Sequence, residues 1–282
     1  MLGVYVINKA SGDNSTSVVS KIKHITGEKC GHFGTLDPLA SGVLPVAVGK
    51  ATKLFDYFLS KDKEYYAIGK FGIETDTLDS QGEIIKTDNK KITLDQINKV
   101  LSQFVGKIVQ IPPKYSAINI NGKRAYDMAR NGENFDIKPR QIEIYGLTAE
   151  KYDENMFSFE IHCSAGTYVR MLISDIAKAV GTIATTVCII RRASGDFLLK
   201  NSYTLSQVEK GEAKLLSVDK FLNLPTIKLN KTVATKLLNG QTVATEITKE
   251  KTLCYFGNKP VGIVATKNQK SKIDINLWEE DK

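Results

Sequence analysis

The sequence predicts an α+β fold with a mixed, largely antiparallel central sheet, followed by a small β-rich module at the C-terminal end. Two observations carry this prediction. Strand-like alternation recurs along the chain and a few helix-like segments interrupt it, which is the pattern of an α+β protein. Beyond about Pro225 the sequence pattern changes, and short strand candidates follow one another. The 282 residues suffice for one large domain and one small domain.

The first third of the chain contains the patterns of two strands and one helix. Residues 3–8 alternate as a short strand. Ser15 can cap the helix that follows, in which apolar residues recur on one face until Gly27 ends it. A stretch rich in glycine and proline comes next, and residues 64–71 then form a second strand by pattern.

The middle of the chain adds a helix and a hairpin. Thr93 and Gln96 have the spacing of a capping box, in which each side chain satisfies a free backbone N–H group at the start of a helix. Gly106 stops this helix. Residues 142–152 and 156–164 form the two arms of a hairpin, because both segments alternate and turn-forming residues separate them.

The last third predicts one more helix and the C-terminal module. The helix follows Gly166 and ends at Gly181. The module contains three strand candidates, at residues 252–256, 261–266 and 272–278. A unit of roughly 60 residues is small for an independent fold, so we expect it to dock on the main domain.

Composition describes a globular protein without a membrane segment. Hydrophobic residues make up 42% of the chain and charged residues 25%. No apolar run approaches the roughly 18 residues of a membrane span, and no basic-then-apolar signal opens the chain. We therefore expect a cytoplasmic protein with no membrane contact. The absence of coiled-coil heptads and of a large amphipathic stripe predicts a monomer with no obligate protein partner.

The net charge of +8 has two explanations. It favours a polyanionic partner such as nucleic acid. It also fits a solvated, lysine-rich surface with no partner at all. Charge alone does not decide between them.

No motif for binding a metal or a nucleotide is complete in this sequence. The four cysteines and three histidines form no CxxC or HExxH pattern. Residues 49–52 are similar to a phosphate loop, but Ala51 breaks the required Lys-Ser/Thr pair. Residues 74–82 are similar to a calcium loop, yet Leu78 occupies a ligand position and the closing glutamate is missing. We expect neither a metal nor a cofactor.

The stretch GHFGTLDPLASGVLP (residues 31–45) holds one acid in unusually irregular sequence. Pro38 biases Asp37 away from helical backbone, so a loop presents this carboxylate. Gly34 and Gly42 lack side chains, which lets backbone approach a ligand closely. An aspartate before proline more often caps a helix or makes a turn. A catalytic carboxylate is the alternative, and the sequence leaves nucleophile and general base open.

Ordered blocks of this sequence resemble the bacterial tRNA pseudouridine-55 synthases, the TruB family. The strongest block is GHFGTLDPLASGVLPVAVGKATK, which resembles the family's catalytic stretch. Further blocks are KEYYAIGKFGIETDTLDSQG (63–82), IPPKYSAINING (111–122), GKRAYDMARNG (122–132) and GTYVRMLISDIA (166–177). The resemblance favours the catalytic interpretation of Asp37 over the turn.

The resemblance implies a fold, a reaction and a division into domains. Residues 1–222 would form a catalytic domain of the pseudouridine-synthase fold, with an RNA-gripping insertion at about 111–140. Residues 223–282 would form a PUA-like RNA-binding domain. The implied reaction flips a uridine out of the tRNA T-loop, breaks its glycosidic bond, turns the uracil and attaches carbon 5 to the ribose, without a cofactor.

Three residues match the family's catalytic positions. Asp37 matches the essential aspartate, which attacks the sugar, attacks the base or removes a proton. Tyr65 matches a tyrosine that stacks on the uracil, and Tyr66, on the opposite strand face, is then the core aromatic. Arg170 matches the arginine that pairs with the acid, and a neighbouring guanidinium favours an ionised carboxylate.

Other matches concern the RNA. His32 matches a histidine that holds the tRNA loop once the base has left its stack. The basic, tyrosine-containing segment 111–140 can neutralise phosphates and stack on bases, although by itself it is also an ordinary solvated surface. The remaining residues assigned to substrate or RNA binding are Lys9, Gly34, Tyr115, Lys123, Arg124, Arg130 and Ile190. Ile190 stands where the family has a leucine near the uracil, and the motif around Lys9 lacks the usual proline.

Two other functions compete with this one. The first is an RNA chaperone that binds and folds tRNA without catalysis, but binding alone does not require Asp37, Tyr65 and Arg170 together. The second is a pseudouridine synthase that acts on another RNA. GTLDPLASG is typical of the T-loop enzymes, which favours tRNA.

Overall fold

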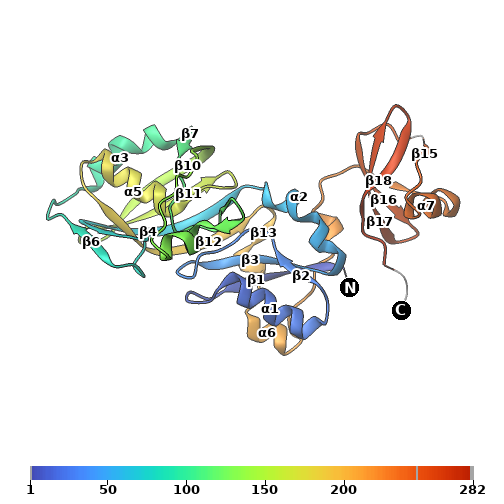
Figure 1. Ribbon diagram of the computed structural model, residues 1–282, viewed down its shortest axis with the longest axis horizontal. Coiled ribbons are helices and arrows are strands. Elements are labelled where there is room, and N and C mark those ends of the chain that lie inside the picture. The colour runs from blue at the N-terminus through green and yellow to red at the C-terminus, as the bar shows by residue number, and fades with distance from the viewer. Residues whose placement is uncertain (1, 246, 280–282) are drawn as a thin grey trace.

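The centre of the fold is a mixed sheet. The computed structural model describes residues 2–245 and 247–279, and within these residues the sheet has nine strands (Figure 1). Its main path runs through β1 (Gly3–Lys9), β3 (Ser41–Val48), β12 (Ala184–Ser194), β4 (Lys63–Phe71), β11 (Met156–Cys163), β10 (Arg140–Asp153) and β7 (Gly106–Gln110). The short strands β2 (Cys30–His32) and β13 (Phe197–Leu198) pair with β3 and β12. Strands β3 and β12 pair in parallel and the other neighbours on this path antiparallel, so the predicted sheet is confirmed.

The helices are short. They are α1 (Ser15–Thr26), α2 (Phe55–Leu59), α3 (Leu94–Leu101), α4 (Ala125–Arg130), α5 (Val169–Ala179), α6 (Leu205–Glu209) and α7 (Lys231–Leu238). Turns of 3-10 helix occur at η1 (Gly49–Leu54), η2 (Ser102–Phe104), η3 (Leu199–Asn201) and η4 (Val218–Phe221). Among residues 2–245 and 247–279, no helix combines the length and the hydrophobicity needed to cross a bilayer.

The predicted helices are present, with corrections at their ends. The cap of α1 is Asn14 rather than Ser15: the Asn14 side chain accepts a hydrogen bond from the backbone N–H of Thr16, and Ser15 is the first helical residue. The capping box at the start of α3 is confirmed, with both reciprocal hydrogen bonds between Thr93 and Gln96. Helix α3 ends at Leu101, and the 3-10 turn η2 follows it. Gly106 is already the first residue of β7.

The predicted hairpin consists of β10 and β11. Asn155 makes the turn with a φ of 53°, a conformation that asparagine tolerates better than most residues. Phe157, Phe159 and Ile161 are buried in the core as their alternation predicts. Ser158 is buried as well, so β11 is covered on both faces at this point.

Helices α3 and α5 lie together over β4, β10 and β11 (Figure 1). The contact between α5 and β4 is very close. A Cβ atom at Gly69 in β4 would lie 2.7 Å from the Cγ2 atom of Ile173 in α5. Gly69 therefore lets the helix settle onto the sheet, and it fixes how far Arg170, at the start of α5, stands from the strands.

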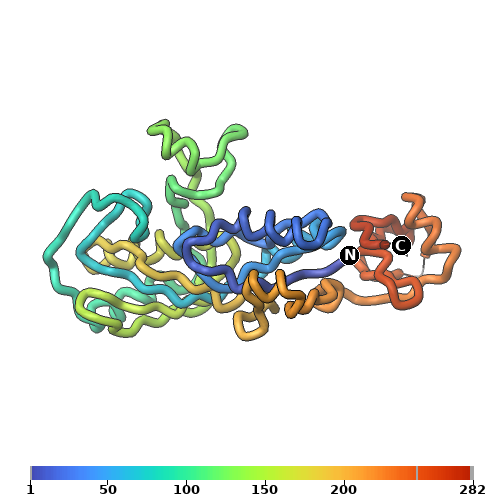
Figure 2. The backbone as a smooth tube through the Cα atoms, turned by 90° about the horizontal axis from the view of Figure 1, so that it is seen from below, coloured from blue at the N-terminus to red at the C-terminus, as the bar shows by residue number. Residues whose placement is uncertain are grey.

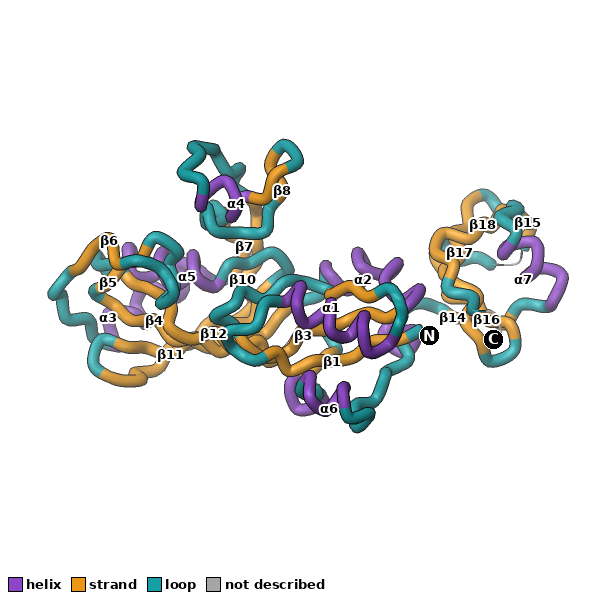
Figure 3. Tube along the Cα trace, turned by 60° about the horizontal axis from the view of Figure 1, so that its bottom comes forward, coloured by secondary structure: helices purple, strands orange, loops and turns teal. Residues whose placement is uncertain are grey.

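Two small hairpins lie outside the central sheet. The first pairs β5 (Ile73–Thr75) with β6 (Ile84–Thr87). The second pairs β8 (Asn119–Ile120) with β9 (Lys123–Arg124) and belongs, with α4, to the segment between β7 and β10. This segment stands out from the body of the molecule, as the green part of Figure 2 and the α4–β8 region of Figure 3 show.

The C-terminal module is a second, five-stranded sheet within the described residues, with α7 beside it. Its strands, in spatial order, are β14 (Thr226–Lys228), β16 (Lys251–Phe256), β17 (Lys259–Lys267), β18 (Lys270–Asn276) and β15 (Val243–Ala244). The pattern predicted β16, β17 and β18 but missed β14, β15 and α7. Leu253, Ile263 and Leu277 join one hydrophobic cluster with Val4 and Val43 of the main sheet, which confirms the expected docking.

Gly42 brings two strands of the central sheet together. Its φ is +98°, and a Cβ atom there would lie 2.3 Å from the carbonyl oxygen of Arg191 in β12. The sequence predicted that this glycine lets backbone approach a ligand. The structure corrects this, because the close approach is between β3 and β12.

The substitution Gly42→Ala should therefore destabilise the fold. We expect the free energy of unfolding to fall by about 3 kcal/mol or more, because the backbone conformation is strained and β12 must move away. Gly31→Ala is the matched control, since the new Cβ atom meets its nearest neighbour at 3.8 Å. Urea denaturation of both variants measures the difference, and equal stabilities would contradict the close contact.

Candidate active site

The loop that carries Asp37 is held from the side of α1. The Ser15 hydroxyl donates to the carbonyl oxygen of Leu36 at 2.7 Å and accepts from the Leu36 N–H group at 3.0 Å. The Lys9 ammonium donates to the carbonyl oxygen of Pro38 at 3.4 Å. Hydrogen bonds on both sides of Asp37 leave this loop little freedom, so its carboxylate has a fixed place.

Arg191 holds the same loop from strand β12. Its guanidinium is buried, with 1% of the residue exposed. It donates to the carbonyl oxygens of Val43 at 2.7 Å, Thr35 at 3.3 Å and Gly34 at 3.1 Å. The segment before Asp37 is thereby tied to the central sheet.

Asp37 forms an ion pair with Arg170. The Oδ2 atom of Asp37 lies 2.7 Å from the Nη2 atom of Arg170, and the two side chains are 34% and 4% exposed. The guanidinium also donates to the carbonyl oxygens of Thr77 at 2.7 Å and Tyr115 at 2.9 Å. Its Nη1 atom lies 3.5 Å from the carboxylate of Asp79. Arg170 is therefore placed by three residues from two other chain segments, in addition to its pair with Asp37.

Two further sets of hydrogen bonds position Arg170 and its neighbours. Gln110 at the end of β7 accepts from the Tyr168 N–H group at 2.8 Å and donates to the Tyr168 carbonyl oxygen at 3.1 Å, which fixes the start of α5. The loop that carries Asp79 is tied to Thr186 of β12 by hydrogen bonds from both flanking residues. The site is thus built on the sheet and on the first turn of a helix.

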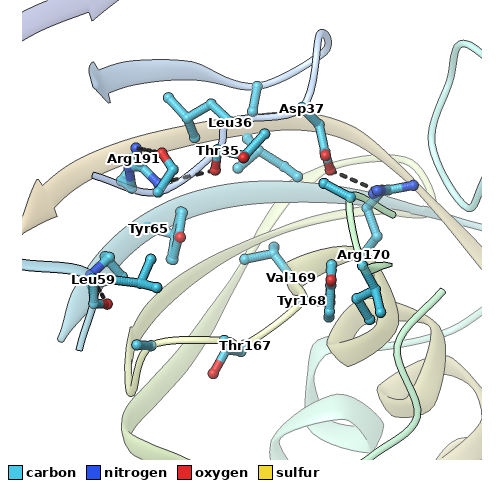
Figure 4. A pocket seen from close by; sticks show the side chains of 18 of the residues that line it. Thr35, Leu36, Asp37, Leu59, Tyr65, Thr167, Tyr168, Val169, Arg170 and Arg191 are labelled. Carbon is cyan, nitrogen blue, oxygen red and sulfur yellow. Dashed lines mark hydrogen bonds and ion pairs between the residues drawn. The ribbon is translucent and has the colours of Figure 1, made fainter. Parts of the chain in front are cut away.

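A cavity of about 650 Å³ opens beside this ion pair, a size that suits a small organic group such as a nucleobase with its sugar. Asp37 and Arg170 lie on one side of it, and Tyr65 and Arg191 on the other, as Figure 4 shows. Other residues that line the cavity are Gly34, Leu59, Lys63, Ile118, Arg140, Tyr168 and Ile189. Burial raises the pKa of the Tyr65 phenol, so this ring is neutral at physiological pH.

The two adjacent tyrosines face opposite ways, as predicted. Tyr65 faces the cavity. Tyr66 is half-buried on the other face of β4, where the guanidinium carbon of Arg192 lies 5.0 Å from the centre of its ring. The prediction that Tyr66 packs in the core is therefore wrong, because an arginine covers this ring instead.

A second cavity, of about 470 Å³, lies on the other side of Asp37 and Arg170. Its wall contains the acidic residues Asp76, Asp79 and Glu83. Tyr115, Tyr126 and Arg130, from the segment between β7 and β10, also line it. Asp37 and Arg170 thus stand between two cavities, one lined by cations and one lined partly by acids.

The RNA-binding candidates are divided between these surfaces. Gly34 lines the first cavity, and Tyr115 and Arg130 line the second. Lys123 and Arg124 are exposed on the protruding segment. The Lys123 ammonium lies 3.2 Å from the Glu133 carboxylate, and Arg124 donates to the carbonyl oxygen of Ala117 at 2.6 Å.

Three candidates lie away from the cavity walls. Lys9 is buried, and its ammonium donates to backbone carbonyl oxygens, including that of Asp13 at 2.7 Å. Through its hydrogen bond to Pro38 it helps to hold the Asp37 loop in place. The Nδ1 atom of His32 is buried with no hydrogen-bond partner among the described residues. Burial lowers the pKa of His32, with the charge of Arg191 adding to the effect. Ile190 does not line the first cavity, whereas its neighbour Ile189 does.

The sequence missed two cations of the first cavity, Arg191 and Lys63. The Lys63 ammonium donates to the carbonyl oxygens of Leu59 and Lys61. Lys63 stands at the start of a predicted strand. A lysine at such a position is normally exposed, so its place in the sequence indicated the surface rather than a cavity. Among residues 2–245 and 247–279, no group of three or more potential metal ligands comes together.

A loop aspartate paired to a buried arginine lies above this mixed sheet, and the fold is that of a pseudouridine synthase. The chain belongs to the TruB family: residues 22–169 match the model described as TruB family pseudouridylate synthase, N-terminal domain.

Relatives and a solved structure agree with this assignment. The chain is 42% identical over 254 residues to the tRNA pseudouridine synthase B of Caldanaerobacter subterraneus, covering 89% of each protein. It is 37% identical to that of Mesoplasma florum, covering 93% of this chain and 92% of the relative. A chain in the crystal structure of a Cbf5-Nop10-Gar1 complex matches with a TM-score of 0.67 at 26% identity, over 93% of this chain and 78% of that one.

The buried Lys63 should give the stability of the fold a specific pH dependence. Burial, and then the charge of Arg191, lower the pKa of this ammonium from 10.5 to about 8. Between these two values the unfolded chain keeps a proton that the folded chain has lost, so the free energy of unfolding rises with pH, by at most about 1.4 kcal/mol per unit.

The variant Lys63→Met lacks this contribution. Between pH 8 and 10 the wild type should gain stability relative to the variant by up to about 1.4 kcal/mol per unit, measured by urea denaturation. Lys91→Met, at an exposed lysine, is the control and should follow the wild type. A difference between wild type and Lys63→Met that stays constant with pH would contradict the lowered pKa.

Proposed function

We propose that this protein isomerises the uridine at position 55, in the T-loop of tRNA, to pseudouridine. The ion pair of 2.7 Å between Asp37 and Arg170, at the edge of a cavity of nucleotide size, carries the proposal. The names of the relatives, tRNA pseudouridine synthase B, support tRNA as the substrate. A buried guanidinium favours the ionised form of the carboxylate that it contacts.

The reaction requires a base outside its stack. Extruding a nucleotide from folded RNA costs a few kcal/mol, and contacts in the cavity must repay it. Tyr65 presents its ring to the cavity and can stack on the uracil. Asp37 then acts on the extruded nucleotide while the glycosidic bond breaks, the uracil turns and carbon 5 joins the ribose. These steps only rearrange the substrate, so this route needs no cofactor.

The remaining roles concern the RNA around the base. His32, with a buried and unpartnered Nδ1 atom, would hold the loop next to the extruded base, and Gly34 would let the nucleotide approach the backbone. Tyr115, Lys123, Arg124 and Arg130 would grip the stem and loop from the protruding segment.

The proposed division of labour follows the two sheets. Residues 1–222 would form the catalytic domain, and residues 223–282 a PUA-like domain that adds a second RNA contact. A monomer in the cytoplasm, where tRNA is processed, fits this function.

The first test removes the charge of Asp37 and nothing else. Wild type and Asp37→Asn are incubated with unmodified tRNA, and pseudouridine is mapped by chemical labelling and primer extension. We expect one labelled site in the T-loop with wild type, and a loss of at least about 1,000-fold in rate with the variant. Asp175→Asn, at a partly exposed residue that pairs with Lys178, is the control and should retain activity.

Other outcomes separate the competing functions. Labelling outside the T-loop would favour a synthase for another RNA. Tight tRNA binding without any product would favour a chaperone. Full activity of Asp37→Asn would overturn the assignment of the catalytic carboxylate.

The second test concerns phosphate contacts of the protruding segment. Lys123 and Arg124 are exposed, and the pair between Lys123 and Glu133 is a surface ion pair that gives little stability and can be exchanged for phosphate. The double variant Lys123→Ala with Arg124→Ala should reduce the slope of log affinity against log salt by about one to two units. Lys91→Ala with Lys99→Ala is the control, and an unchanged slope in the first variant would exclude both residues from the interface.

A further inference from the structure

Arg191 is a buried cation with no acidic partner. Its three hydrogen bonds run to the backbone carbonyl oxygens of Gly34, Thr35 and Val43. Among residues 2–245 and 247–279, no carboxylate forms an ion pair with it. Carbonyl dipoles satisfy N–H groups but do not cancel a full charge, and an uncompensated buried charge is costly. A fold that needed only to fasten this loop could use a neutral donor.

The charge of Arg191 is directed at the first cavity. Arg191 lines this cavity and is the register partner of Tyr65 on the neighbouring strand. In Figure 4 its guanidinium lies on the Tyr65 side of the pocket, across from the Asp37–Arg170 pair. Burial is the largest cause of the lowered pKa of Lys63 and of His32, and the charge of Arg191 is the second. Lys63 lines the cavity together with Arg191, so the positive charge of Arg191 acts on this end of the cavity.

The proposed reaction creates a negative charge in this cavity. When the bond between ribose C1′ and uracil N1 breaks, the electron pair stays with N1 and the detached ring is an anion. A new bond then forms from C5 to C1′, the proton of C5 leaves, and N1 gains a proton. Atoms and charge balance, but between the two bond events the ring is negative. Asp37 is itself an anion and its partner Arg170 is engaged by it, so neither neutralises the ring.

We propose that Arg191 is a further catalytic residue, whose guanidinium stabilises the uracil anion while the ring is detached from the ribose. Tyr65 supplies the face on which the ring turns, and Arg191 supplies the charge beside it. A fixed cation placed where charge develops needs no rearrangement during the reaction, which makes such groups effective in water-poor sites. The inference rests on the proposed function, because only glycosidic cleavage produces the anion.

Three variants of Arg191 separate charge from packing. Arg191→Gln keeps a hydrogen-bond donor without the charge, Arg191→Met keeps the bulk alone, and Arg191→Lys keeps the charge. In single-turnover assays with unmodified tRNA, the two neutral variants should lose about 100-fold in rate, and Arg191→Lys less than about tenfold. The affinity for tRNA should change less than about threefold, because the free substrate is not yet charged at the base.

Arg192→Gln is the matched control. Arg192 is the next residue on the same strand, but it faces the other side of the sheet, where it pairs with Glu160 at 2.7 Å and covers Tyr66. It loses the same charge outside the cavity and should retain the wild-type rate. A similar loss in Arg192→Gln would show that overall charge, and not its place in the cavity, is responsible.

A second substrate distinguishes electrostatic catalysis from a structural defect. Transcripts that carry 5-fluorouridine release a ring whose negative charge the fluorine already stabilises. Loss of the intact nucleoside is followed by nuclease digestion and chromatography. The defect of Arg191→Gln should be at least about tenfold smaller with the fluorinated RNA, whereas a displaced loop would slow both substrates equally.

The outcomes also separate this inference from the proposed function. An inactive wild type would refute the function. An active wild type with equal defects on both substrates, or with no defect, would overturn the role of Arg191 alone. Thermal melting checks the fold of each variant. If both neutral variants unfold, Arg191→Lys decides, because a folded lysine variant as slow as Asp37→Asn would overturn the proposal.

Discussion

The ion pair between Asp37 and Arg170 is the interaction on which the rest of the structure depends. A carboxylate and a guanidinium in a water-poor place gain little net stability from each other, and either one left alone would be costly. The fold therefore places Arg170 independently of its partner, with the carbonyl oxygens of Thr77 and Tyr115 and the carboxylate of Asp79 around it. Asp37 is fixed in the same way, by hydrogen bonds to the residues before and after it. The two side chains of the pair are therefore each positioned by contacts other than the pair itself.

Besides Arg170, three buried cations lie near the Asp37 loop or the first cavity, and they differ in how firmly they hold their protons. Burial lowers the pKa of Lys9 and of Lys63 to about 8, so both ammonium groups can release their protons at moderately alkaline pH. A guanidinium remains charged throughout this range. Arg191 therefore keeps its charge at alkaline pH, where Lys9 and Lys63 begin to lose theirs. The wall of the second cavity contains the acidic residues Asp76 and Glu83. Arg130 of the protruding segment and Arg170 also line this cavity, so its wall carries charges of both signs.

The sequence predicted what depends on local patterns. The loop around Asp37, the capping box of Thr93 and the β10–β11 hairpin were all visible, because each is set by residues close together in the chain. Strand β12 was missed: its apolar run lacks alternation, and such a run does not distinguish a buried strand from a buried helix. Arg191 lies in this strand, and its contacts reach residues 148 to 157 positions away. Alternation along β12 puts Ile189 and Arg191 on the face of the first cavity, and with the strand itself missed this face could not be assigned from the sequence.

The C-terminal module docks close to the strand that leads away from the Asp37 loop. Strand β3 begins directly after the Asp37 loop, and both of its faces are buried. Leu44 and Val46 face the core of the catalytic sheet, while Val43 and Ala47 face the cluster that Leu253, Ile263 and Leu277 of the module complete. The module meets the main domain at η1, the 3-10 turn that directly follows β3, where the Lys53 ammonium donates to the carbonyl oxygen of Asn276 at 3.2 Å. Val43 is also the residue whose carbonyl oxygen accepts the 2.7 Å hydrogen bond from Arg191. The module therefore docks beyond the end of β3, whereas Arg191 and the catalytic loop are anchored near the start of the same strand.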